Sequence, residues 1–207
     1  MSNVPQILRM ASGRLEALGD GIFSVAMTLL VIEIPLPKGN PRNFSEFATA
    51  IHGIWGQLGC YVISFVILGI MWFGHRMMFE YIGRTNRYFI FLGVLFYMIV
   101  CLVPFTTRFL ASDARQWYTI LCYGVNLSLC NLTLYAQWSY GIKRESLLDK
   151  ELPAEVRKEA RMLFLLSPVV YSIAIAFSFF APIVSIIIFV ITPLLYLIPN
   201  KIDKHLP

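Results

Sequence analysis

Long apolar runs recur along this 207-residue chain, and each is close to the length that crosses a lipid bilayer. The hydrocarbon core of a bilayer is about 30 Å thick, so a spanning helix needs about 20 apolar residues. The chain is 57% hydrophobic and 14% charged, which excludes an ordinary soluble domain. The sequence therefore predicts one all-α membrane domain over residues 1–207, without internal repeat, whose six spans are roughly 17–34, 56–79, 88–110, 117–141, 162–180 and 182–199.

Prolines mark the boundaries and irregularities of these spans. Pro35, Pro37 and Pro41 end the first span and open a loop over residues 35–47. Pro104 and Pro168 lie inside spans and predict kinks. Only the turn around Ala181 and Pro182 separates the last two spans, so one long broken helix is the alternative there. Opposite charges at helical spacing in residues 155–161 predict a solvated helix that leads into the fifth span.

The basic residues predict the topology. With six spans and the N-terminus inside, only Lys38, Arg42, Arg108 and Arg115 of the 17 basic residues lie outside. Cytoplasmic segments are enriched in Lys and Arg, so we expect a multi-pass protein of the cell membrane with both termini in the cytoplasm. The net charge of +5 is explained by this distribution, and we expect no nucleic-acid partner.

The first span carries the most informative ionisable residue. Asp20 lies about a turn inside the apolar run, and an ionisable group there is a functional-site candidate because it is costly. Val25, Thr28, Leu29 and Ile32 follow an i, i+3, i+4, i+7 pattern and share one stripe of a helix, about 130° from Asp20. That stripe is either a packing surface within one subunit or a surface where copies meet around an axis.

A second polar group lies near the end of the second span. Trp72 and His75 share one helix face and lie at a depth similar to Asp20, because consecutive spans run antiparallel. His75, Trp72 and Arg14 are the candidate partners of the buried carboxylate. The four residues form either a structural polar network or a proton relay. No acid or histidine follows in the third to sixth spans, which favours the structural interpretation.

Catalytic and metal-binding patterns are absent from the sequence. There is no HExxH, no GxSxG with partners and no phosphate-binding glycine loop. Cys60, Cys101, Cys122 and Cys130 fall inside predicted spans without metal-ligand spacing. We therefore expect neither an enzyme nor a resident metal or cofactor.

At the first span the sequence has Arg14, Leu18, Gly19 and Asp20, followed by Thr28-Leu29-Leu30. These residues resemble the signature of the transmembrane protein 175 family of endosomal and lysosomal potassium channels. The family signature reads Arg-x-x-x-Phe-Ser-Asp, so this chain has Leu18 where Phe is usual and Gly19 where Ser is usual. The Trp72 and His75 pair and the LVPFTT run at 102–107 resemble the next two spans of the family. The likeness covers about the first 110 residues.

The resemblance implies a homotetramer of six-span subunits that passes potassium ions through a central pore lined by the first helices. Carried over by position, Val25, Leu29 and Ile32 would form a hydrophobic gate of three rings, and Thr28 would be the selectivity layer. The filter would differ from one built of backbone carbonyls, and narrow apolar rings would gate by dewetting. Glu33 and Glu46 are candidates to attract cations to the outer mouth.

Two other functions remain open at the level of sequence. A proton-coupled membrane transporter would use Asp20 and His75. A membrane scaffold without transport would leave Val25 and Leu29 against lipid.

Overall fold

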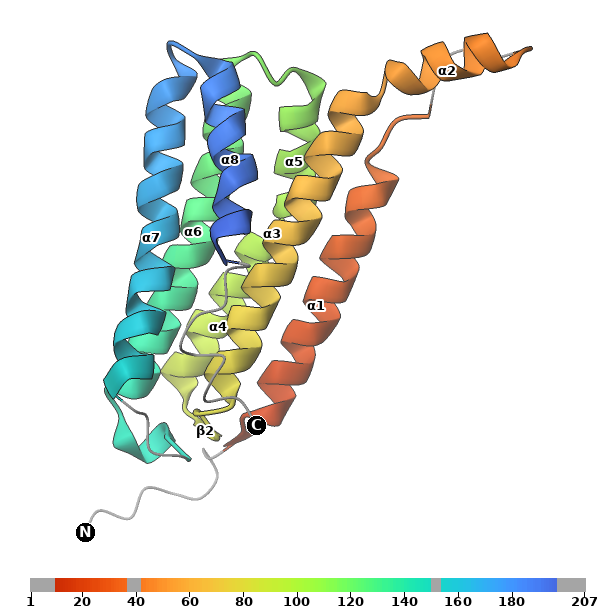
Figure 1. Cartoon of the computed structure of the whole chain (residues 1–207). Helices are drawn as coiled ribbons and strands as arrows, with labels where there is room; N and C mark the ends of the chain where they lie inside the picture. Colours follow the sequence, from red (N-terminus) through yellow and green to blue (C-terminus); the bar gives the residue numbers. More distant parts are fainter. Residues whose placement is uncertain (1–9, 37–41, 150–153, 197–207) are drawn as a thin grey trace.

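The computed structural model describes residues 10–36, 42–149 and 154–196, which are mostly helical (Figure 1). The helices of the bundle are α1 (Gly13–Ile32), α3 (Trp55–Phe79), α4 (Arg87–Val100), α5 (Val103–Ser112), α6 (Trp117–Ile142), α7 (Ala154–Ser178) and α8 (Pro182–Tyr196). Smaller elements at its ends are helix α2 (Phe44–His52), the 3-10 turn η2 (Glu145–Leu147) and strands β1 (Met10–Ala11) and β2 (Arg84–Thr85).

Helix α1 lies along one edge of the bundle, and α7 lies at the opposite edge (Figure 1). Helix α6 packs against α4, α5 and α7, whereas α1 packs against α3, α4 and α5. Large apolar side chains fill the space between the helices, among them Phe23, Leu68, Phe96 and Leu127. We call the end of the bundle with β1 and β2 the sheet end and the other end the α2 end; α1 runs from the first to the second.

Four of the described helical segments are long and apolar enough to cross a membrane: Gly13–Ile32, Trp55–Phe79, Arg87–Ser112 and Trp117–Ile142. They coincide with the first four predicted spans. The remaining apolar helical stretches, Phe164–Ser178 and Pro182–Pro193, are shorter. The six-span count therefore stays a prediction for the last two. Helix α7 ends at Ser178 and α8 begins at Pro182, and the two pack against each other as separate helices.

The third membrane-length segment is interrupted at Cys101 and Leu102, between α4 and α5. Pro104 lies in the first turn of α5, where its missing N–H is tolerated. The side-chain amide of Asn126, on α6, fits the interruption in one orientation. Its nitrogen then donates to the Ile99 carbonyl at 3.2 Å, and its oxygen accepts from the Val103 N–H at 3.2 Å. Asn126 thus satisfies backbone groups that the interruption leaves without an α-helical partner.

Pro168 lies inside α7, which continues from Ala154 to Ser178 without a break. The predicted helix over residues 155–161 forms the start of α7. Arg157, Lys158 and Arg161 of this segment are exposed.

Helix α2 corrects the interpretation of residues 35–47 as a loop. Helix α1 ends at Ile32, ahead of Pro35, but the chain re-enters a helix at Phe44. The Asn43 side chain accepts from the Glu46 N–H at 2.9 Å, and the Glu46 carboxylate accepts from the Arg42 N–H at 2.8 Å. This arrangement is similar to a capping box, except that the carboxylate accepts from the N–H of the residue before the N-cap. Its Asn-x-x-Glu pattern is visible in the sequence, but the three prolines beside it favour a loop.

The sheet end joins three connections. β1 pairs antiparallel with β2, so the chain that enters α1 is bonded to the α3–α4 connection. The Asp149 N–H donates to the Tyr81 carbonyl at 3.0 Å, which bonds the α6–α7 connection to the same segment. The start of α1 is thereby linked to the α3–α4 connection, and through it to the α6–α7 connection.

Candidate functional site

Helix α1 has one buried face and one uncovered face. Leu15, Gly19, Phe23, Ala26 and Leu30 are buried against the bundle. Val25, Leu29 and Ile32 are 57%, 40% and 73% exposed, and Thr28 is exposed beside them. At about 100° per residue the centre of this stripe lies about 130° from the centre of the buried face. The stripe therefore points away from the bundle, on the edge where α1 lies in Figure 1.

The Thr28 hydroxyl is oriented by its own helix. Its Oγ1 donates to the Val25 carbonyl at 2.8 Å. A hydroxyl has one proton and two lone pairs, so the oxygen remains able to accept or to coordinate a cation. In the single chain this oxygen lies on the uncovered face.

Asp20 is bound to the neighbouring helix through Trp72. The indole Nε1 of Trp72 donates to Asp20 Oδ1 at 2.8 Å. Of the three candidate partners considered from the sequence, Trp72 makes this hydrogen bond. Asp20 is thus tied to α3 on the flank of α1, away from the centre of the Val25–Ile32 stripe.

His75 belongs to a separate hydrogen-bonded chain. Its Nε2 lies 2.7 Å from the Tyr97 hydroxyl, which lies 2.8 Å from the Leu15 carbonyl. A carbonyl only accepts, so Tyr97 donates its single proton to Leu15 and accepts one from His75 Nε2. This fixes the tautomer of the neutral ring and leaves His75 Nδ1 buried without a partner in the described part of the chain. Tyr97, absent from the sequence-based site, is the residue that connects α4 to α1.

Gly19 explains how His75 and Tyr97 approach α1 so closely. A Cβ atom at position 19 would lie 2.6 Å from His75 Cε1 and 2.8 Å from the Tyr97 hydroxyl. Both separations are shorter than real Cβ contacts, so a larger residue requires these side chains to shift. The glycine that departs from the family signature is therefore matched to the aromatic side chains that face it.

Arg14 and Leu18 lie outside these contacts. Both are exposed, and Arg14 forms no hydrogen bond or ion pair with any residue that the structure describes. The cation that faces α1 near its base is instead Arg76, whose guanidinium lies 3.7 Å from the Glu16 carboxylate.

The LVPFTT run has a structural role in the interior. Thr107 Oγ1 donates to Ser64 Oγ at 2.9 Å, and Ser64 Oγ lies 2.9 Å from the Tyr123 hydroxyl. All three side chains are buried. They join α3, α5 and α6, so the run both starts α5 and binds it to its neighbours.

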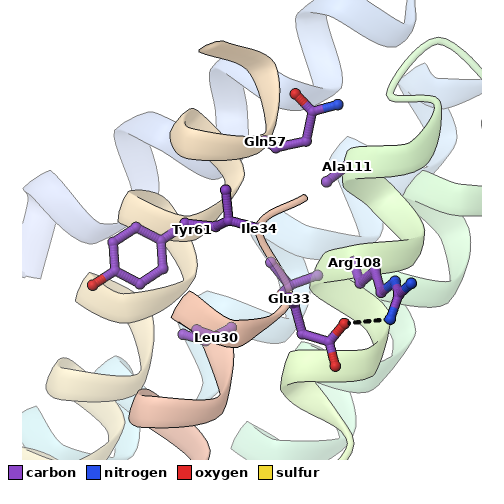
Figure 2. A pocket seen from close by; sticks show the side chains of 8 residues that line it. Leu30, Glu33, Ile34, Gln57, Tyr61, Arg108 and Ala111 are labelled. Atoms are coloured by element: carbon purple, nitrogen blue, oxygen red, sulfur yellow. Dashed lines mark hydrogen bonds and ion pairs between the residues drawn. The ribbon is translucent and has the colours of Figure 1, made fainter. Parts of the chain in front are cut away.

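At the α2 end, Glu33 follows the last residue of α1 and pairs with Arg108 of α5. Arg108 Nη1 lies 2.8 Å from Glu33 Oε2. Figure 2 shows the two side chains pointing toward each other, beside a small pocket whose lining includes Leu30, Ile34 and Tyr61. The Glu46 carboxylate accepts from the Arg42 N–H at the start of α2. Both carboxylates considered from the sequence as free cation attractors are therefore bonded within the chain.

Residues 10–36, 42–149 and 154–196 contain no group of three or more His, Cys, Asp or Glu side chains that could hold a metal ion. The candidate site is therefore an apolar stripe with one hydroxyl, on a helix that hydrogen bonds link to α3 and α4.

The described chain contains several helices of membrane-spanning length, joined by buried hydrogen bonds. It is therefore a multi-span helical membrane protein. Residues 14–104 match the family described as the endosomal/lysosomal potassium channel TMEM175. A potassium channel of Streptomyces collinus is 31% identical over 173 residues, which cover 81% of this chain and 82% of that protein. The chain belongs to the TMEM175 family.

Two further comparisons describe the breadth of the likeness. A crystal structure of a lysosomal potassium-selective channel TMEM175 homologue from Chamaesiphon minutus has a TM-score of 0.75 and 23% identity, covering 90% of this chain and 96% of that one. It supports the fold. The mouse endosomal/lysosomal proton channel TMEM175 is 30% identical over 109 residues, which are 50% of this chain and 22% of the mouse protein. These relatives are named as channels and not as enzymes.

Proposed function

We propose that the chain is the subunit of a homotetrameric potassium channel that conducts K+ passively along a central axis lined by four copies of α1. The observation that carries the proposal is the uncovered face of α1: Val25, Leu29 and Ile32 are exposed apolar residues on the helix at the edge of the bundle. The name of the Streptomyces collinus relative supports potassium as the permeant ion.

Four copies of this face around an axis give a stack of apolar rings. Val25 and Ile32 are seven residues apart, so the stack is about 10 Å long at 1.5 Å per residue. A narrow apolar constriction of this kind sheds water and stops ions by dewetting. Conduction requires the rings to widen, which a tilt or rotation of α1 would achieve.

Thr28 is the residue in the stack that can replace part of the hydration of an ion. Its hydroxyl proton is held by the Val25 carbonyl, so the oxygen presents lone pairs. Four such oxygens at one level form a ring of uncharged ligands, which suits a weakly hydrated monovalent cation. Selectivity in this proposal resides at Thr28, and closure resides at Val25, Leu29 and Ile32.

The polar contacts toward the sheet end hold α1 in position. The Trp72–Asp20 bond and the His75–Tyr97–Leu15 chain attach α1 to α3 and α4 of its own subunit. They set the angle at which the gate residues face the axis. Because the sheet end carries most of the basic residues, this end faces the cytoplasm of a cell-membrane protein with six spans and both termini inside.

Purified protein in liposomes with an outward K+ gradient tests the proposal. We expect K+ efflux that increases in Val25→Ala and Leu29→Ala, because smaller side chains leave a wider opening, which dewets less readily. Val31→Ala is the matched control, since Val31 is an exposed valine of α1 outside the stripe. No K+ flux from the unmodified protein or from either gate variant would contradict the channel.

A proton-coupled transporter using Asp20 and His75 is the second candidate. The buried Nδ1 of His75, which has no partner among the described residues, favours it, because an unprotonated ring nitrogen can accept a proton. Against a relay, Asp20 and His75 bond to different partners. Substrate flux that saturates and is lost in Asp20→Asn and His75→Ala, in protein that still elutes as the native oligomer, would favour the transporter. Flux that persists in the double variant would exclude the relay.

A further inference from the structure

The ion pair between Glu33 and Arg108 lies one residue beyond the last residue of the proposed gate. Glu33 Oε2 and Arg108 Nη1 are 2.8 Å apart, and the two residues are 75 positions apart in sequence, with α2, α3 and α4 between them. The Glu33 side chain is 27% exposed and the Arg108 side chain 70% exposed, so the pair lies at the solvent-facing margin of the bundle. Figure 2 shows it bridging the end of α1 and the flank of α5.

Local helix energetics do not account for an acid at this position. Glu33 is the C-cap residue of α1, with its N–H bonded to the Leu29 carbonyl at 3.2 Å. The C-terminal end of a helix carries partial negative charge, so a carboxylate there is unfavourable without a cation beside it. The Arg108 guanidinium supplies that cation from another helix. The pair is therefore a tertiary connection.

Helix α5 is a fixed point of attachment for α1. Asn126 bonds the backbone at the start of α5, and Thr107, next to Arg108, donates to buried Ser64. Two side-chain contacts from α6 and α3 thus hold α5 in place. The end of α1 has less support, since the residues after Ile32 leave the helix as a turn.

We propose that Arg108 is a positioning residue for the ion path: by pairing with Glu33 it draws the α2 end of α1 toward α5 of its own subunit and so sets the radius of the pore at Ile32. The inference rests on the proposed function, because it requires α1 at the axis. Helix α5 lies on the bundle side of α1, so the pair pulls away from the axis. Loss of the pair lets the four Ile32 side chains approach one another and narrows the outer ring.

A different role for Glu33 predicts the opposite result at Arg108. If Glu33 acts as a vestibule charge that concentrates cations, Glu33→Gln lowers K+ current and Arg108→Gln raises it, because net negative charge falls in one and rises in the other. If the pair positions α1, both substitutions lower K+ current. The sign of the Arg108→Gln effect therefore separates the two roles.

The experiment measures K+ flux and single-channel current for the unmodified protein, Glu33→Gln, Arg108→Gln and the charge-reversed double variant Glu33→Arg with Arg108→Glu. We expect each single substitution, present in all four subunits, to lower the measured K+ flux about two- to five-fold. This is the range of effect that the free energy of an exposed ion pair supports. The reversed pair restores at least half of the unmodified flux. Arg115→Gln is the control, since it removes an exposed positive charge at the same end without touching the pair, and we expect unchanged flux.

A second readout does not depend on conduction. Ile32→Cys places thiols at the outer ring, and we expect their oxidative cross-linking between copies to accelerate when Arg108→Gln is added. The same chain without Ile32→Cys measures the background from the native cysteines. Unchanged or increased K+ flux in Arg108→Gln, with cross-linking unchanged, overturns the positioning role and leaves the channel intact. Absence of flux from every variant, together with absence of cross-links from every chain that carries Ile32→Cys, overturns the proposed function instead.

Discussion

The indole nitrogen of Trp72 lies 2.8 Å from the Asp20 carboxyl and joins the second membrane-length helix to the first. The Asp20 carboxyl is therefore held on the flank of α1 by a donor from α3. Tyr97 makes the corresponding link from α4, where its hydroxyl bonds the Leu15 carbonyl at 2.8 Å. Two neighbouring helices thus hold α1 through contacts that lie outside its exposed apolar stripe.

Trp72→Phe keeps an aromatic ring and removes the donor to Asp20. Hydrogen bonds to charged groups contribute about 1.5–3 kcal/mol, so we expect a clear drop in the thermal midpoint of the detergent-solubilised protein. Trp55→Phe is the control, because Trp55 is 61% exposed at the start of α3. Equal effects from the two substitutions would show that the Asp20 contact does not stabilise α1.

Gly19→Ser restores the serine of the family signature and is expected to destabilise this chain. A Cβ at residue 19 meets His75 Cε1 at 2.6 Å, whereas a Cβ at Gly21 has nothing within 4 Å. Overpacking of this kind costs about 1–3 kcal/mol. Thermal unfolding of Gly19→Ser and Gly21→Ser compares the same change on the same helix. A Gly21→Ser variant as unstable as Gly19→Ser would contradict the steric argument.

Asn126→Ala is expected to lower stability through the break between α4 and α5. It leaves the Val103 N–H without the side-chain acceptor that faces it, and an unsatisfied buried polar group costs about 1–3 kcal/mol. Asn131→Ala is the matched control, since buried Asn131 on the same helix bonds the Leu127 carbonyl of α6 itself. Yield of intact oligomer and thermal midpoint should fall in the first variant and remain near the unmodified values in the second.

Thr28→Val preserves shape and removes the oxygen from the proposed selectivity layer. We expect the preference for K+ over Na+ to fall, because four potential ligands are lost. Thr28→Ser retains the oxygen and should retain most of the preference. Thr133→Val, which removes an α6 hydroxyl bonded within its own helix, is the control. Bi-ionic reversal potentials measure the outcome, and an unchanged potential in Thr28→Val would place selectivity elsewhere.

The sequence predicts much of the bundle because its signals are local. Apolar length locates the first four membrane-length helices, and Pro104 predicts an irregularity where Cys101 and Leu102 separate α4 from α5. The sequence predicts a loop where α2 begins, because the capping signal at Asn43 and Glu46 lies between prolines and a short apolar segment. Local periodicity also identifies the stripe from Val25 to Ile32, although the sequence alone does not decide what covers it.

The polar contacts depend on which helices touch, and no local pattern specifies this. His75 is a plausible partner of Asp20 by depth, yet it bonds Tyr97, a residue inside an otherwise apolar run. Glu33 and Arg108 are 75 residues apart and meet because α1 and α5 pack side by side. A hydroxyl or a charge inside an apolar run is the sequence signal that identifies such residues as candidates, although not their partners.

The pairing of β1 with β2 gives the two ends of α1 unequal freedom. Ala11 is opposite Arg84 in this ribbon, so the base of α1 is anchored two residues before the helix begins. At 1.5 Å per residue, Val25 lies about 18 Å and Ile32 about 28 Å along the helix from Gly13. A tilt about the anchored base therefore acts as a lever that displaces Ile32 about one and a half times as far as Val25. One rotation would therefore move the residues along α1 by graded distances, smallest at Gly13 and largest at Ile32.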